Sequence, residues 1–376
     1  MRLSYIRQRL HDLGAKPCHA DRLLRGWSQV RSCDIKGSPA EIFFPLALRN
    51  QLPDIAAELD GLAQLHGEYP ANGHGLNTDK HPESHDRFPS PTLPRIAGEG
   101  SNVALRASSN DDEVARLLVE LRDGQMVESV LLPRGGLCVS TQVGCAVGCV
   151  FCMSGRDGLI RQLGSAEIVA QVVLARKRRA VSKVVFMGMG EPAHNLDNVL
   201  EAIEMLGTLG GIGHKSLVLS TVGDLRVFER MPLGKVRPAL ALSLHTTDAA
   251  LRARLLPRAP QIAIEELVER AEVYARTTRY PTQYQWTLIE GVNDGDAEME
   301  RIVQLLSGKY AVMNFIPFNP VDGLPYRRPS TGRVSGIMHG LNRRGIYTRI
   351  RDSAGQEVEG ACGQLRARAV GTRQVA

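Results

Sequence analysis

The sequence lacks any apolar run long enough to cross a membrane, so a membrane protein is not expected. Its first residues, MRLSYIRQRLHDLG, also lack the apolar core of a secretory signal. They instead predict an amphipathic helix with Leu3, Ile6 and Leu10 on one face. Asp12 and the helical pattern that follows it disfavour an organelle transit peptide. We therefore expect a cytoplasmic protein.

Cysteine is scarce, with seven residues in 376, and the number is odd. In a chain without an export signal, this argues against a disulfide scaffold and favours ligand or redox chemistry in a reducing compartment. Four of the seven fall between positions 138 and 152, and Cys362 stands alone near the other end. Cys18 and Cys33 have no such context and are expected to be packing residues.

Acidic residues are fewer than basic ones, which gives a formal charge of +6 and a pI near 9.0. This balance favours a polyanionic partner, although alone it does not separate an RNA enzyme from other basic proteins. Basic residues available for phosphate contact cluster in three short runs, for which solvated helix faces are the simpler interpretation: Arg176, Lys177, Arg178, Arg179, Arg327, Arg328, Arg343 and Arg344.

Local patterns divide the chain into three parts. Residues 1–62 predict a small helical accessory domain that could help to recognise RNA. Residues 63–110 are rich in Pro, Gly, His and Ser and predict a linker or insertion, to which we assign no function. Residues 111–376 predict the catalytic domain, opened by a β-hairpin at Asp123-Gly124.

Strand-like and helix-like segments alternate through this third part. The expected strands are KVVFMGM, SLVLST, PALALSL, YQWTLIE, VMNFIPF and YTRIRD. One of the helices between them should start with Ser165 as its N-cap. This alternation predicts an α/β fold with a parallel sheet, and about six units favour an incomplete (β/α)6 barrel. Chemistry in such barrels lies at the carboxyl ends of the strands.

The central motif is Cys145-Ala-Val-Gly-Cys149-Val-Phe-Cys152. Three thiolates in this C-x3-C-x2-C spacing suit a 4Fe-4S cluster, whose fourth iron stays open to chelate S-adenosylmethionine. One electron from the cluster then releases a 5′-deoxyadenosyl radical, and Phe151 would shield the cluster. Zinc is the alternative, but its cysteines usually come in well-separated pairs, and no nearby histidine follows this trio.

From Glu128 to Leu365 the sequence resembles the RlmN/Cfr family of radical S-adenosylmethionine RNA methyltransferases. The matching segments are LCVSTQVGCAVGCVFC, VVFMGMGEP, LST, LSLH, LIEGVND, IPFNP and EVEGACGQL, in family order. The resemblance implies an RNA methyltransferase that uses two S-adenosylmethionine molecules and a 4Fe-4S cluster. Its product would be an adenosine methylated on a ring carbon, C2 rather than C8, in ribosomal or transfer RNA. A flavodoxin-type protein would donate the electrons.

The same resemblance implies roles for individual residues. Cys362 matches the cysteine that first accepts a methyl group, and Cys138 the one that later forms a transient disulfide with it. Glu128 matches the proposed proton acceptor. The cluster ligands are Cys145, Cys149 and Cys152. The expected S-adenosylmethionine contacts are Gly190, Glu191, Ser220, Ser243, Leu244, His245 and Asn319.

The sequence departs from the family at several positions. Met153-Ser154 replace a small residue followed by Thr, SLHTT replaces SLHAP, and Gln285-Trp286 replace an acidic–aromatic pair. These changes keep the catalytic set but leave the RNA target open. Two alternatives also stay open. One is a radical enzyme that acts on a small molecule or protein and does not need Cys138 and Cys362. The other is a non-catalytic RNA-binding relative without a cluster.

Overall fold

The structure, a computed structural model, describes residues 1–32, 40–71, 113–321, 323–351, 356 and 359–367. Cys33 and most of the expected linker lie outside these ranges. Across the described ranges, no helix is both long and apolar enough to cross a lipid bilayer.

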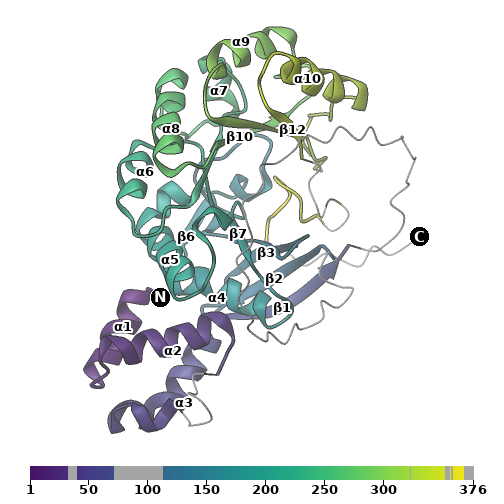
Figure 1. The fold of residues 1–376 in the computed structure, drawn as a ribbon. Coiled ribbons are helices and arrows are strands. Elements are labelled where there is room, and N and C mark those ends of the chain that lie inside the picture. The colour runs from purple at the N-terminus through teal and green to yellow at the C-terminus, as the bar shows by residue number, and fades with distance from the viewer. Residues whose placement is uncertain (33–39, 72–112, 322, 352–355, 357–358, 368–376) are drawn as a thin grey trace, which may run out of the picture.

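One ten-stranded sheet organises the molecule (Figure 1). Its strands, in spatial order, are β1 (Ala63–Pro70), β2 (Ala115–Leu121), β3 (Met126–Leu132), β4 (Gly136–Cys138), β7 (Lys183–Phe186), β8 (Leu217–Thr221), β9 (Ala239–Ser243), β10 (Thr282–Leu288), β11 (Ala311–Pro317) and β12 (Thr348–Ile350). The strands from β4 to β12 pair in parallel, whereas β1 to β4 pair antiparallel. The predicted α/β fold and all six predicted strands are confirmed.

Helices connect the parallel strands, as parallel pairing requires. They are α4 (Ser165–Arg176), α5 (Leu196–Thr208), α6 (Leu225–Arg230), α7 (Ala249–Leu255), α8 (Ile264–Thr278), α9 (Asp296–Leu306) and α10 (Thr331–Arg343). Short 3-10 turns are η1 (Ala40–Phe43), η2 (Met153–Gly155), η3 (Pro192–Asn195), η4 (His214–Ser216) and η5 (Met231–Leu233). A separate two-stranded antiparallel sheet joins β5 (Gln142–Gly144) to β6 (Leu159–Gln162).

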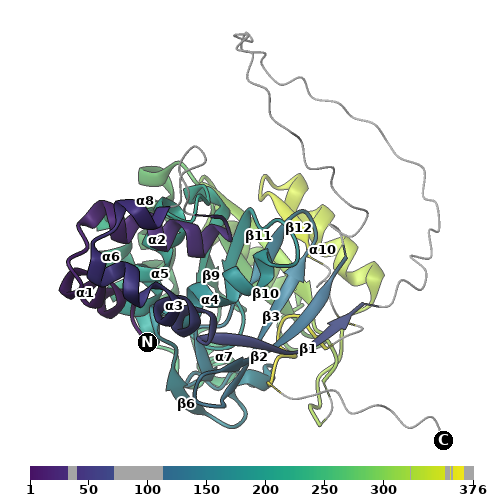
Figure 2. The ribbon, with the colours of Figure 1, turned by 90° about the horizontal axis from the view of Figure 1, so that it is seen from below.

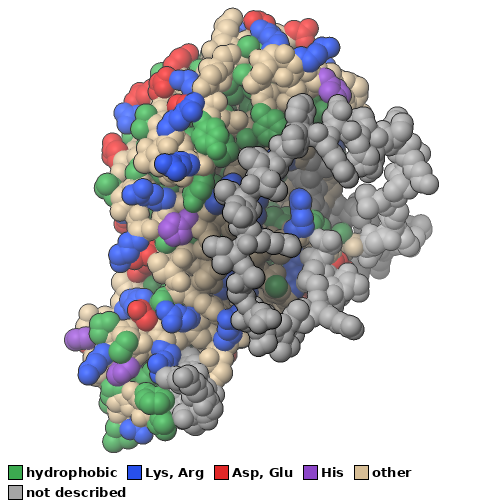
Figure 3. Space-filling view, viewed as in Figure 1, with side chains coloured by type: hydrophobic (Ala, Val, Ile, Leu, Met, Phe, Trp, Pro, Cys, Tyr) green, Lys and Arg blue, Asp and Glu red, His purple; other side chains and the backbone are tan. Residues whose placement is uncertain are grey.

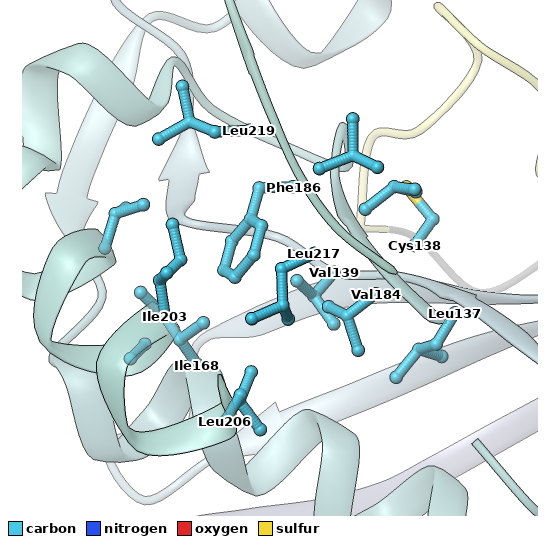
Figure 4. Packing of buried hydrophobic residues seen from close by; sticks show 14 of the residues in the cluster. Leu137, Cys138, Val139, Ile168, Val184, Phe186, Ile203, Leu206, Leu217 and Leu219 are labelled. Atoms are coloured by element: carbon cyan, nitrogen blue, oxygen red, sulfur yellow. The ribbon is translucent and has the colours of Figure 1, made fainter. Parts of the chain in front are cut away.

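The core lies between the sheet and these helices. Figure 4 shows side chains of β4, β7 and β8 meeting Ile168 of α4 and Ile203 and Leu206 of α5. Because successive side chains of a strand point to opposite faces, Leu137 and Val139 enter this core while Cys138 lies on the other side, toward the C-terminal segment. Strand β4 thus sends its cysteine into the barrel interior.

The helical accessory unit comprises α1 (Leu3–Asp12), α2 (Pro17–Gln29) and α3 (Leu46–Asp60). It packs against the outer side of α4 (Figure 2), with α2 in direct contact with α4. Helix α4 is therefore buried on all sides: of its twelve residues, Arg176 alone is not buried. The unit and the barrel consequently share one continuous core.

Three predictions need correction. Residues 63–70 are strand β1 and not linker, because Ala63, Leu65 and Tyr69 alternate with exposed residues along the edge of β2. The N-cap of α4 is Gly164 and not Ser165, whose hydroxyl instead donates to Glu201 (2.6 Å). Cys18 is exposed and does not pack. The hairpin prediction is confirmed, with Gly124 at φ 79° between β2 and β3.

Candidate functional site

The predicted site residues converge at the carboxyl ends of neighbouring parallel strands. Cys138 ends β4, and Gly190 and Glu191 follow β7. Ser220 is the penultimate residue of β8, and Ser243 ends β9. Asn319 follows β11 two residues after Pro317. Because these strands are adjacent and parallel, segments far apart in the sequence meet at one edge of the barrel, where such folds carry their chemistry.

The loop with the three motif cysteines follows β5 and folds into a second, smaller core. Cys145 and Phe151 pack there with Val222, Leu256 and Phe318, and Cys149 and Cys152 line its margin. Gly144 anchors the loop, since at φ 77° an added Cβ would lie 2.0 Å from the carbonyl oxygen of Gly158. The three thiols therefore share one apolar environment.

Electrostatics also place the three thiols within reach of one another. Burial is the main cause that raises the pKa of Cys145 to about 12, and the charge of Cys152 acts in the same direction. Burial, followed by the charges of Cys152 and Cys145, raises the pKa of Cys149 well above its usual value. Burial likewise raises the pKa of Cys152. Each thiol must lose its proton to bind a metal, so metal binding here releases protons. Within the described ranges, no three His, Cys, Asp or Glu side chains are grouped to hold a single metal ion.

Cys138 and Cys362 come together in the fold, although about 220 residues separate them in the sequence. Burial, and after it the charge of Cys362, raises the pKa of Cys138 to about 12. Cys362 is exposed to solvent, yet the surrounding protein and then the charge of Cys152 raise its pKa to about 11, while Arg351 acts to lower it. Both cysteines are free thiols. Cys362 thus lies near both Cys138 and a motif cysteine.

Backbone contacts fix the segment around Cys362 against the loop that carries the three motif cysteines. The N–H of Met153 donates to the carbonyl of Gly363 (2.8 Å), and the hydroxyl of Ser154 donates to the carbonyl of Leu365 (2.7 Å). The amide of Asn319 donates to the carbonyl of Cys362 itself (2.9 Å). Met153 and Ser154, which depart from the family pattern, therefore hold the segment that carries Cys362.

Glu128 lies beside the segment that follows Cys362, and its side chain is 1% exposed. Its carboxylate forms a buried ion pair with Arg116 of β2, and it accepts the backbone N–H of Arg366 (2.8 Å). Burial raises the pKa of Glu128, while Arg116 lowers it. Arg116 was not among the residues predicted from the sequence. Arg116 and Glu128 lie on one face of the β2–β3 hairpin. Glu128 pairs directly with Leu118, and Arg116 lies two residues before Leu118, so the two charged side chains are diagonal neighbours. This spacing in the hairpin is the signal that could have revealed the pair.

Glu191 is held at the end of β7 by backbone donors. Its carboxylate accepts the N–H groups of Ala193 and Val222, each at 3.0 Å, so it connects the ends of β7 and β8. Burial raises the pKa of Glu191, and its hydrogen bonds lower it. Gly190 is required here, since at φ 102° an added Cβ would lie 2.6 Å from the side chain of Gln142. A buried carboxylate in this position can pair with an ammonium group.

His245 is fixed in one orientation after β9. Its Nδ1 accepts the N–H of Thr287 (3.0 Å), so the neutral ring carries its proton on Nε2. Burial, and after it the charge of Arg252, lowers the pKa of His245 to about 3. The ring meets the edge of Phe151 with centroids 4.8 Å apart. The neighbouring Leu244 is fully buried, and its N–H donates to the carbonyl of Gln285 (3.0 Å).

Two buried charged residues at the site were not predicted from the sequence. Arg252 of α7 is 5% exposed and donates to the carbonyls of Val222 and Ser243. Burial lowers its pKa, while the charges of Cys149 and Glu191 raise it. Glu298 of α9 is also 5% exposed and accepts the N–H of Thr247 (2.9 Å). Nothing in the local pattern distinguishes these residues from charges on a helix surface.

Most of the basic residues that the sequence offered for phosphate contact are engaged within the protein. Lys177 pairs with Asp60, Arg178 with Glu68, Arg327 with Glu290 and Arg344 with Glu300. Arg176 and Arg179 donate to backbone carbonyls. These runs therefore stabilise the surface and the junction between the helical unit and the barrel.

Comparison with known proteins agrees with this arrangement. Residues 139–306 match the Radical SAM superfamily. The chain is 60% identical to a probable RNA methyltransferase of Leptothrix cholodnii, over 98% of this chain and 95% of the relative. It is 59% identical to a probable RNA methyltransferase of Pseudomonas aeruginosa, over 98% and 96%. A solved radical SAM methyltransferase from Sphaerobacter thermophilus is 30% identical, covers 98% of both chains and superposes with a TM-score of 0.76.

Proposed function

The chain belongs to the radical S-adenosylmethionine methyltransferases, and from this premise we propose that it methylates a ring carbon of an adenosine in RNA. The proximity of Cys138, Cys362 and the motif cysteines carries this proposal. A ring carbon such as C2 is not nucleophilic, so its methylation needs a radical source and a second pair of thiols beside it. Cys138 and Cys362 would be that pair. The relatives from Leptothrix cholodnii and Pseudomonas aeruginosa, both probable RNA methyltransferases, support RNA as the substrate. We favour C2 over C8, in ribosomal or transfer RNA.

Cys145, Cys149 and Cys152 would hold a 4Fe-4S cluster, because they offer three clustered thiols in an apolar loop. When bound, the cluster and S-adenosylmethionine supply a radical and a methyl group. Glu191 offers a carboxylate for the ammonium of S-adenosylmethionine, and the ends of β8, β9 and β11 place Ser220, Ser243 and Asn319 around the same space. His245, neutral because of its low pKa, presents an Nε2–H donor.

Cys362 would accept the methyl group and carry the carbon to the adenine. Glu128 would take the ring proton, which requires one carboxylate oxygen to leave its present donors, Arg116 or the N–H of Arg366. The Cys138 thiolate would then attack the Cys362 sulfur and form a disulfide, while the electron pair of the broken sulfur–carbon bond passes to the carbon, which takes up a proton and leaves as the methyl group of the product. A thiol reductant would return the disulfide to two thiols for the next turnover. A flavodoxin-type electron donor and a cytoplasmic location complete the proposal.

The decisive experiment is mass spectrometry of a Cys138→Ala variant expressed with cellular RNA. Without the resolving thiol, Cys362 should remain covalently joined to a modified adenosine, and sequencing the attached RNA would name the target. Cys18→Ala, which removes an exposed cysteine from α2, is the matched control and should carry no adduct. If Cys138→Ala contains the cluster but Cys362 carries neither methyl nor RNA, the proposal is wrong.

A radical enzyme that acts on a small molecule or protein is the second candidate. It predicts that Cys362→Ala keeps its activity, whereas our proposal predicts complete loss of RNA methylation. Cluster absorbance should be unchanged in this variant, because Cys362 is not one of the three motif cysteines.

A further inference from the structure

The motif LIEGVND carries a buried amide that connects two strand ends. Asn293 of this motif is 0% exposed and lies in the turn that follows β10. Its Nδ2 donates to the carbonyls of His245 (2.7 Å) and Thr287 (2.8 Å), and its Oδ1 accepts the N–H of Ile289 (2.8 Å). Both amide hydrogens and the amide oxygen are therefore used, and one side chain joins the ends of β9 and β10.

His245 has a backbone conformation that residues with a Cβ seldom adopt. Its φ is 63°, in the left-handed region. A strained residue of this kind persists only where the surrounding contacts determine its conformation, and such residues gather at functional sites. The hydrogen bond from Asn293 to the carbonyl of His245 is a contact that can hold this conformation.

The same pair of strand ends fixes the direction of the His245 ring. Its Nδ1 accepts the N–H of Thr287 (3.0 Å), the residue whose carbonyl also binds Asn293. The ring meets the ring of Phe151, which lies within the loop of the three motif cysteines, with centroids 4.8 Å apart. The remaining ring donor, Nε2–H, is thus held in one place beside this loop.

Two further buried side chains hold the residues on either side of His245. Arg252 donates to the carbonyl of Ser243 (3.3 Å), and Glu298 accepts the N–H of Thr247 (2.9 Å). Every second residue of this segment is therefore bonded by a buried side chain from outside β9. The amide of the LIEGVND motif is the one that reaches the backbone of His245 itself.

The same set of hydrogen bonds extends to Glu191. Arg252 also donates to the carbonyl of Val222, whose N–H donates to Glu191 (3.0 Å). The Glu191 carboxylate and the His245 Nε2–H, both proposed to contact S-adenosylmethionine, are therefore fixed relative to each other. The barrel is hollowed at the centre of the face shown in Figure 3, so its interior is open to a ligand.

We propose that Asn293 is a positioning residue, which holds His245 in its left-handed conformation so that Nε2–H meets an acceptor atom of S-adenosylmethionine. Asn293 does not touch the cofactor, because its own polar atoms are all bonded to the backbone. Its loss would let His245 return to an ordinary φ and turn the ring away. This inference rests on the proposed contact between His245 and S-adenosylmethionine.

The test is a double-variant cycle of S-adenosylmethionine affinity, measured by calorimetry on the cluster-loaded, oxidised enzyme. Asn293→Asp keeps the shape of the side chain but replaces the amide donor by a carboxylate that repels both carbonyls. It should raise the Kd about tenfold, as for the loss of one well-placed hydrogen bond. His245→Asn should have a similar effect, and asparagine tolerates the left-handed backbone. The double variant should bind no more weakly than His245→Asn, because Asn293 acts through His245.

The ring of His245 gives a second readout, which does not depend on the cofactor. In ¹⁵N NMR of the histidine-labelled protein, wild-type His245 should be a single neutral tautomer with its proton on Nε2, and the spectrum of His245→Asn assigns the signal. Asn293→Asp should show a mixture of tautomers. Asn293→Ala, which buries no charge, should give the same two results and serves if the aspartate variant does not fold.

Asn342→Asp is the matched control. Asn342 likewise bonds the backbone, since it accepts the N–H of Thr348 (2.9 Å) and donates to its carbonyl (3.2 Å). Thr348 begins β12, so this contact lies at the amino end of the sheet, opposite the site. The control variant should keep the wild-type Kd and the wild-type His245 signal.

The outcomes separate this inference from the proposed function. Equal losses of affinity on replacing Asn293 with and without His245 would show that the two act independently and would overturn the inference. Asn293 variants that lower the urea midpoint but keep the wild-type Kd would also overturn it, since the role of Asn293 would then be in folding alone. If His245→Asn keeps the wild-type Kd, the contact of His245 and this inference both fail. The RNA adduct on Cys362 tests adenosine methylation separately from all these results.

Discussion

At the scale of single residues, the buried ion pair between Arg116 and Glu128 affects both the stability of the fold and the proposed chemistry of Glu128. Both side chains are 1% exposed, so loss of one partner leaves the other charge buried and uncompensated. We expect Arg116→Met to lower the free energy of unfolding by about 3–5 kcal/mol. The Arg116→Met/Glu128→Leu double variant should lose less, because it removes both charges. Urea unfolding measures both changes, and equal losses in the two variants would contradict this account.

His245 gives a pH prediction with a definite sign. Its pKa is about 3 in the folded protein, below the usual value of about 6.5, so the unfolded chain binds more protons between these values. The stability contributed by neutral His245 is present above pH 6.5 and is lost as the pH falls toward 3. At pH 5 this loss amounts to about 2 kcal/mol.

The difference between His245→Asn and the wild type isolates this contribution from those of other groups. From pH 7.5 to 5, the wild type should lose about 2 kcal/mol more of its unfolding free energy than the variant does. Parallel pH profiles for the two proteins would show that His245 does not remain neutral.

At the scale of elements, the β5–β6 pair positions Cys145, the first of the three motif cysteines. Gly144 and Gly158 both have positive φ, 77° and 75°, but an added Cβ meets the carbonyl of Gly158 at 2.0 Å in the first case and nothing within 4 Å in the second. Gly158→Ala should therefore cost about 1–2 kcal/mol from backbone strain alone. Gly144→Ala should cost more and also displace Cys145.

Iron content per chain and the thermal midpoint measure these two effects. We expect Gly144→Ala to lose both iron and stability, and Gly158→Ala to lose a little stability while keeping its iron. Equal iron content in the two variants would show that the hairpin does not position Cys145.

At the scale of the whole molecule, the helical unit and the barrel should unfold together, because both pack on α4. The chain has two tryptophans, Trp27 in α2 and Trp286 in β10, and each reports on one part. Leu48 of α3 is fully buried, so Leu48→Ala should cost about 2–5 kcal/mol. Its unfolding midpoint should fall equally in Trp27→Phe and Trp286→Phe backgrounds. A midpoint that falls only where Trp27 is retained would mean two independent units.

The sequence predicted the strands and the cysteine motif because both are local patterns, namely runs of β-branched residues and fixed spacings. The site residues were assigned through the resemblance to a known family, and their roles stay predictions. Arg116 beside Glu128 was missed although the register of one hairpin places them diagonally. The sequence could not reveal Arg252 beside Glu191, since that pair depends on which distant charges meet in the fold. Strand β1 escaped notice because its alternation is hidden in a segment rich in Gly, His and Pro.

The attachment of the Cys362 segment to the loop of the three motif cysteines has a consequence for the synthesis of the chain on the ribosome. About 210 residues separate Cys152 from Cys362, so at about 5–20 residues per second a ribosome needs roughly 10–40 s to pass from one to the other. During that interval the three motif cysteines have been made, but the segment of Cys362 that bonds to their loop has not. If these cysteines hold the proposed cluster, its metal can be delivered to the loop before translation of the last segment attaches that segment to it.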